Sequence, residues 1–132
     1  MDFTAFHNAE RDGWHDRAAG YGTATALATL QIIPAMLEAL HLRTGQRLLD
    51  LACGPGYVAG AAHALCLDVD GVDFAPGMID AAKARFPGVN FPGADVQGLP
   101  FGDNSFDAAA CDIGLCHVAD PSKALSEVAR VL

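Results

Sequence analysis

Basic residues are scarce in this chain of 132 residues. Eight Lys and Arg stand against sixteen Asp and Glu, which gives a net charge of −8. The few cations are scattered singly, so no basic stripe can neutralise a phosphate backbone, and the sequence predicts no nucleic-acid partner. Although 52% of the residues are hydrophobic, no run approaches the ~18 uninterrupted apolar residues that a membrane span needs. We therefore expect one buried core, no membrane span and a small-molecule partner.

Metal-binding cysteine pairs and targeting signals are also lacking. The four cysteines form no CxxC pair, and only Cys111, Cys116 and His117 fall close together. Because a structural zinc site takes four ligands, we expect no metal site and interpret the cysteines as free thiols. The opening residues have neither the basic region nor the apolar region of a secretory signal, which predicts a cytoplasmic location.

The sequence does contain an apolar run that ends in a glycine-rich turn. Residues 48–56 read Leu-Leu-Asp-Leu-Ala-Cys-Gly-Pro-Gly. Gly54 and Gly56 let the backbone approach a bound molecule closely, and the helix that follows points its free N–H groups at the same place. The pattern is typical of a buried parallel strand that leads into a site for a nucleotide-like cofactor.

Hydrophobic blocks alternate with helical patterns along the chain, which predicts an α/β fold with a parallel sheet. Pro92, which falls within one expected strand, favours the sheet edge for that strand. A helical pattern at 23–40 is kinked or broken at Pro34, or a second helix starts there. Residues 1–22 are polar and aromatic with glycine interruptions, and we expect an arm or lid there. The strands are expected at 47–51, 67–72, 89–94 and 106–111, and the other helices at 57–64, 76–86 and from Pro121 to the end.

Three acidic residues follow three of the expected strands: Asp50, Asp73 and Asp95. Because the carboxyl ends of parallel strands meet at one edge of a sheet, the three carboxylates converge on the glycine-rich turn. Asp73, about twenty residues after the glycines, is placed to accept hydrogen bonds from ribose hydroxyls. Asp95 could accept from an exocyclic amine such as that of adenine. The alternative is that each acid only caps a helix or is solvated in a loop.

Several of these segments resemble the class I S-adenosylmethionine-dependent methyltransferases, in particular the small-molecule branch with the ubiquinone and menaquinone biosynthesis enzymes. The resemblance implies a Rossmann-like sheet of order 3-2-1-4-5-7-6, of which this chain supplies the N-terminal half, so residues 23–132 would form a partial cofactor-binding domain. The resembling segments are 48–56, 71–79, 94–101, 105–107, 117–121 and 127–132.

The resemblance also assigns residues to S-adenosylmethionine, whose product form is S-adenosylhomocysteine. It implies that Asp50 and the turn contact the methionine part, that Asp73 binds the ribose, and that residues after the fourth strand face the reactive methyl group. Two residues depart from the family pattern: Ala52 stands where glycine is common, and Ala75 where serine or threonine caps the helix. The implied cofactor-binding residues are Asp50, Ala52, Cys53, Gly54, Gly56, Asp73, Phe74, Met78, Asp95, Val96, Cys111, Asp112 and Ile113.

The expected chemistry is direct displacement of the methyl group by a small-molecule acceptor, with the protein aligning the two reactants. A base is needed only for an acceptor that must lose a proton. His117 is the first candidate and Tyr21 the second. Packing in the loop before the last helix explains His117 better than catalysis does, and anchoring of the N-terminal segment to the core explains Tyr21 equally well.

Two other functions are open at this point. A cofactor-binding remnant without catalysis would share all of these features. A dinucleotide-binding oxidoreductase half-domain would share the glycine-rich turn and Asp73. In this chain, however, the third glycine stands at Gly60, one position later than the NAD-binding pattern G-x-G-x-x-G requires, and this function leaves Asp95 unexplained. The fourth strand is expected to form an open apolar edge, which predicts a homodimer through that edge.

Overall fold

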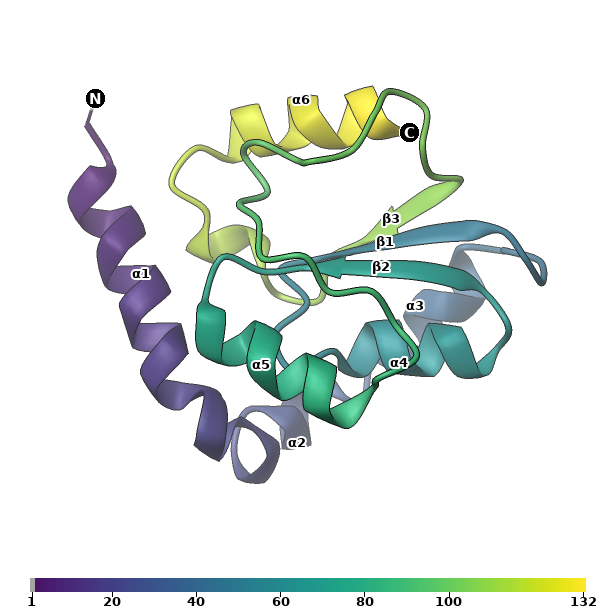
Figure 1. Ribbon diagram of the computed structural model, residues 1–132, viewed down its shortest axis with the longest axis horizontal. Helices are drawn as coiled ribbons and strands as arrows, with labels where there is room; N and C mark the ends of the chain where they lie inside the picture. The colour runs from purple at the N-terminus through teal and green to yellow at the C-terminus, as the bar shows by residue number, and fades with distance from the viewer. Residues whose placement is uncertain (1) are drawn as a thin grey trace.

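The computed structural model describes residues 2–132 and has a parallel three-stranded sheet at its centre (Figure 1). The strands are β1 (Arg47–Leu51), β2 (Asp68–Val72) and β3 (Ala108–Ala110), in the order β2-β1-β3. Asp50 of β1 lies opposite Gly71 on one side and Ala110 on the other. The α/β class with a Rossmann-like parallel sheet is thereby confirmed.

Helices cover both faces of the sheet because the side chains of β1 alternate between them (Figure 1). Leu48 packs into a cluster with residues of α3 (Ile33–Ala39), α4 (Tyr57–Ala64) and α5 (Pro76–Arg85). Leu49 and Leu51 point to the other face, where they pack against α6 (Pro121–Val131) and the loop before β3. This arrangement buries β1 from Leu48 to Leu51, so the glycine-rich turn after it starts from a fixed position.

Two expectations about the strands need correction, and the alternatives for the helical pattern at 23–40 are decided. Residues 89–94 form no strand but two isolated bridges to β2, Asp70 to Asn90 and Asp73 to Gly93, because Pro92 between them has no N–H to continue the ladder. The fourth expected strand keeps only three of its six residues, as β3. The pattern at 23–40 divides into α2 (Ala26–Thr29) and α3, with Pro34 in the first turn of α3, as the second alternative expected.

The N-terminal segment is more regular than expected. It forms α1 (Thr4–Arg17) and the 3-10 helix η1 (Ala18–Thr23), both of which contact α5. His15 Nδ1 accepts a hydrogen bond of 2.9 Å from the N–H of Gly77, in the first turn of α5. Because Ala75 cannot cap α5, His15 supplies the missing acceptor from another helix. None of the helices in residues 2–132 is long and apolar enough to cross a membrane.

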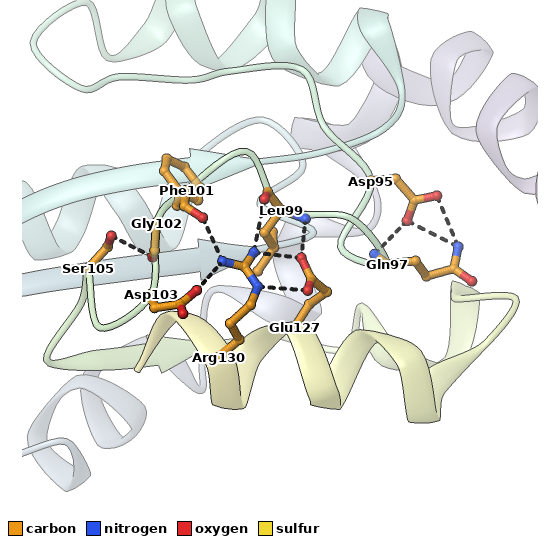
Figure 2. A network of polar contacts seen from close by, with 9 residues as sticks. All are labelled: Asp95, Gln97, Leu99, Phe101, Gly102, Asp103, Ser105, Glu127 and Arg130. Carbon is orange, nitrogen blue, oxygen red and sulfur yellow. Dashed lines mark hydrogen bonds and ion pairs between the residues drawn. The ribbon is translucent and has the colours of Figure 1, made fainter.

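A polar network fastens the long loop before β3 to α6 (Figure 2). The guanidinium of Arg130 donates to the carbonyl oxygens of Leu99 and Phe101, and it pairs with the carboxylates of Asp103 and Glu127. Glu127 in turn accepts from the N–H of Leu99 at 2.8 Å. Its hydrogen bonds with Arg130 lower the pKa of Glu127 to about 2. The network thus fixes the segment that follows Asp95, one wall of the site described next.

Candidate functional site

A cavity of about 230 Å³ opens at the carboxyl ends of the strands. The N-terminal helices cover one side of it, and the glycine-rich turn, the end of β2 and the segment around η2 (Leu115–His117) form the others. Eleven of the fifteen predicted site residues line it. The lining residues are His7, Trp14, Tyr21, Thr25, Ala28, Thr29, Ala52, Gly54, Asp73, Phe74, Met78, Asp95, Val96, Gln97, Asp112, Ile113, Gly114, His117 and Val118.

The turn between β1 and α4 owes its shape to left-handed backbone. Ala52, Gly54 and Gly56 have φ angles of 50°, 52° and 83°. A Cβ on Gly56 would lie 2.8 Å from the ring of Phe91, so only glycine fits there. Ala52 is not glycine, and its left-handed conformation costs about 1 kcal/mol. This strain lies in the cavity wall.

Asp73 connects the glycine-rich turn to the end of β2. One carboxylate oxygen accepts from the N–H of Gly54 at 2.9 Å and the other from the N–H of Ala75 at 2.8 Å. Burial raises the pKa of Asp73, and these hydrogen bonds oppose the shift. Each oxygen retains acceptor capacity toward the cavity, since a carboxylate oxygen can accept two hydrogen bonds. The geometry suits a ligand that presents hydroxyl groups, as a ribose does.

Asp50 lies beneath the cavity instead of in its wall. The residue is 1% exposed, and its carboxylate accepts from the N–H of Ala59 in α4 at 3.0 Å. Burial raises its pKa to about 8. Cys53, Gly56 and Cys111 are also absent from the lining. The structure therefore places these four predicted residues where they shape the turn and the sheet edge, without bringing them to the cavity surface.

The predicted adenine end of the site is already rich in internal contacts. Asp95 accepts from the backbone N–H of Gln97 at 2.8 Å and from its side-chain amide at 2.9 Å. His7 of α1 lies 3.7 Å from the Asp95 carboxylate and meets the ring of Phe74 edge-on, at 5.3 Å between centroids. Phe74 and Met78 supply the apolar surfaces that a planar base would contact. The adenine-reading role of Asp95 stays a prediction, and so does the cofactor contact that the resemblance implies for Val96.

The opposite end of the cavity holds an unpaired acceptor. Oδ1 of Asp112 is buried and has no hydrogen-bond partner within residues 2–132. Burial raises the pKa of Asp112. An unpaired buried carboxylate oxygen is costly unless a donor or a cation reaches it. S-adenosylmethionine carries a cationic sulfonium and an ammonium group, so the residues present at this end fit that cofactor.

Both candidate bases line the cavity. Burial raises the pKa of the Tyr21 hydroxyl. Nδ1 of His117 lies 2.7 Å from a carboxylate oxygen of Glu10, a residue of α1 that the sequence did not single out. His7, Glu10, Trp14 and Tyr21 recur at helical spacing. Because three of them, His7, Trp14 and Tyr21, line the cavity, that periodicity is the signal by which this side of residues 1–22 could have been found.

The sheet order, the turn at the strand ends and the cavity above it define a Rossmann-like domain of the kind that binds nucleotide-like cofactors. Residues 49–132 match the family described as a methyltransferase domain. The chain belongs to this family.

Individual relatives agree with this assignment. A demethylmenaquinone methyltransferase of Paenarthrobacter aurescens is 41% identical over 96 residues, which are 73% of this chain and 38% of the relative. The YcgJ protein of Bacillus subtilis superposes with a TM-score of 0.74 at 31% identity, over 77% of this chain and 46% of that one. Phosphoethanolamine N-methyltransferase 2 of Haemonchus contortus, solved with S-adenosylhomocysteine, superposes with a TM-score of 0.71 at 31% identity, over 77% of this chain and 26% of that one. The chain thus spans less than half the length of these relatives.

Proposed function

We propose that this chain binds S-adenosylmethionine and takes part in methyl transfer to a small-molecule acceptor. The observation that carries the proposal is the junction of Asp73 with the glycine-rich turn, where a buried carboxylate and left-handed backbone meet at the cavity wall. The family match and the relative solved with S-adenosylhomocysteine support the choice of cofactor. They also favour this function over that of a dinucleotide-binding oxidoreductase.

Different lining residues would bind different chemical groups of the cofactor. Asp73 would hold the ribose hydroxyls, and Phe74 and Met78 would pack against the base. Asp112 would attract the cationic end, because its free oxygen lacks a donor within the described residues. When bound, the cofactor supplies an electrophilic methyl group. The chain's own contribution is to orient it and to exclude water, and alignment of this kind can supply on the order of 7–11 kcal/mol.

For the acceptor, we propose a small hydroxylated aromatic ring of the quinol type. The relative from Paenarthrobacter aurescens is named for demethylmenaquinone, and the cavity wall beyond Asp112 is apolar and aromatic, with Trp14, Tyr21, Ile113 and Val118. We propose further that residues 1–22 act as an arm that closes this side, while residues 23–132 carry the partial cofactor-binding domain.

Calorimetric titration of S-adenosylhomocysteine and of NADH tests the cofactor. We expect only S-adenosylhomocysteine to bind. Asp73→Asn, which keeps the volume of the side chain, should weaken it at least tenfold because charge-assisted hydrogen bonds are lost. Asp80→Ala, an exposed acid of α5, is the matched control and should change nothing. NADH binding in place of S-adenosylhomocysteine would refute the proposal. Binding without transfer of a labelled methyl group to naphthohydroquinone would identify the non-catalytic alternative.

We also propose that the β3 edge pairs with a second copy of the chain. β3 is bonded to β1 on one side only. An apolar groove lies between β3 and α6, beside the exposed side chains of Leu115, Leu125 and Leu132. Size-exclusion chromatography at micromolar concentration should show a dimer that Leu125→Glu dissociates, and a monomeric wild type would exclude it.

A further inference from the structure

A carboxylate, an indole and an imidazole meet where the arm covers the cavity. Glu10 and Trp14 belong to α1, whereas His117 ends η2, so the contact joins segments 107 residues apart. Oε2 of Glu10 lies 2.7 Å from Nδ1 of His117 and accepts from Nε1 of Trp14 at 3.2 Å. The rings of Trp14 and His117 meet edge-on, with centroids 4.9 Å apart and planes at 77°. Both the carboxylate and the imidazole are therefore held from two directions.

This geometry fixes the tautomer of His117. An ionised carboxylate only accepts hydrogen bonds, so the neutral imidazole bonds to Glu10 through a proton on Nδ1. The lone pair then lies on Nε2, for which no hydrogen-bond partner is found in the part of the chain that the structure describes. His117 itself lines the cavity. A carboxylate that orients an imidazole, with the other ring nitrogen left as a base, is the arrangement that general-base catalysis uses.

We propose that Glu10 is a positioning residue that holds His117 as the base for an acceptor with an ionisable hydroxyl on an aromatic ring. The inference rests on the proposed function and names the acceptor's reactive feature. An acceptor without a proton to lose, such as a thioether, would need no such base. Trp14 supplies an apolar face beside the imidazole, which suits an aromatic ring and keeps water away from the proton that is transferred.

The O–H bond of the acceptor breaks, and its proton moves to Nε2 of His117, while Glu10 stabilises the resulting imidazolium. The electron pair left on the acceptor forms the new bond to the methyl carbon, either at the oxygen or, through the ring, at the adjacent carbon. The methyl–sulfur bond breaks and its electron pair stays on sulfur. With attack by carbon, the ring C–H proton is then lost to solvent, which restores the aromatic ring.

Nitrogen NMR of the ¹⁵N-labelled chain tests the positioning directly, without turnover. For the neutral imidazole we expect the His117 proton on Nδ1, with the signal assigned by its loss in His117→Asn. Glu10→Ala should move a large part of the population to the Nε2–H tautomer, whereas Asp16→Ala, an exposed acid on the same helix, should leave the tautomer unchanged. If the proton of wild-type His117 is on Nε2, or if Glu10→Ala leaves the tautomer of His117 unchanged, the inference is wrong.

Naphthol serves as the acceptor probe, added with S-adenosylhomocysteine. We expect naphthol to shift the Nε2 signal and Glu10→Ala to weaken its binding by about two- to tenfold, the size of one neutral hydrogen bond. The affinity for S-adenosylhomocysteine should stay within twofold. Equal naphthol binding by both proteins refutes the role of Glu10. Failure of S-adenosylhomocysteine to bind the wild type refutes the proposed function instead, so the two failures are distinguishable.

Discussion

Ala52 and Gly114 share one small space in the cavity wall, and we expect their substitutions to be strongly coupled. A Cβ built on Gly114 would lie 2.4 Å from the Cβ of Ala52, whereas carbon atoms pack at about 3.5–4.0 Å. Neither methyl group can rotate away, so relief requires the backbone to move. Overpacking of this kind costs about 1–3 kcal/mol. Gly114 has an ordinary right-handed conformation, with φ −86° and ψ −30°, so alanine meets no conformational strain there.

Ala52→Gly removes the methyl group with which a Cβ on residue 114 would clash. Ala52→Gly relieves the left-handed φ of 50° but increases the entropy of the unfolded chain, so we expect a net change within about 1 kcal/mol. Gly114→Ala alone should lose about 1–3 kcal/mol. In the double variant the clash disappears, and only the flexible Sγ of Cys111, 3.0 Å from the new methyl group, has to adjust. The double variant should therefore recover most of the lost stability.

Urea unfolding followed by circular dichroism measures the four free energies of this cycle. We expect a coupling energy of at least 1 kcal/mol that favours the double variant, since residues in direct contact rarely behave additively. Unchanged m-values would show that the variants unfold to comparable states. Additivity within about 0.5 kcal/mol would mean that the turn after β1 and the segment after β3 are not in contact, which would refute this arrangement of the cavity wall.

Further substitutions test other parts of the molecule. Gly60→Ala places a Cβ 2.3 Å from the ring of Phe86 and should lower stability by about 1–3 kcal/mol in urea unfolding, whereas Gly98→Ala, with open space, should not. Burial raises the folded-state pKa of Asp50 from 3.8 to about 8, so between these pH values the folded state holds a proton that the unfolded state has lost. The free energy of unfolding of the wild type should therefore fall as the pH rises through this range, by up to about 1.4 kcal/mol per pH unit. Asp50→Asn should flatten this dependence of stability on pH. Arg130→Ala should speed amide hydrogen exchange in the loop 99–105, with α4 unaffected as the internal reference.

The sequence was most reliable where local signals decide the structure. The bounds of β1 and α4 were predicted correctly because an apolar run and a glycine-rich turn follow each other without interruption. The start of α6 was also correct, since Asp120 caps it by accepting from the N–H of Lys123 at 3.0 Å. The strand at 89–94 was wrong because its pairing depends on N–H groups that meet β2, and Pro92 supplies none.

The candidate site shows the same difference between residues that local patterns reveal and residues that depend on long-range contacts. Residues next to the strand ends, such as Asp73 and Gly54, lie together in the cavity lining as expected, because topology alone brings them together. Asp50 does not line the cavity because alternation along β1 turns its side chain toward α4, and proximity to the strand end does not reveal that direction; its role toward the cofactor stays a prediction. Glu10 was missed because its partner lies 107 residues away, and no local pattern encodes such a contact.

The arm contributes to the fold as well as to the cavity, because it completes the N-terminus of α5. That helix has no side-chain cap of its own, and His15 supplies the acceptor for the N–H of Gly77. Glycine is needed there, since a Cβ would lie 2.8 Å from the His15 carbonyl oxygen. The same stretch of α5 carries Met78, and Asp73 bonds to Ala75 just before it. Release of α1 would therefore uncover the cavity beside His7 and Trp14 and remove a hydrogen bond next to Met78, so these two parts of the cavity wall form together.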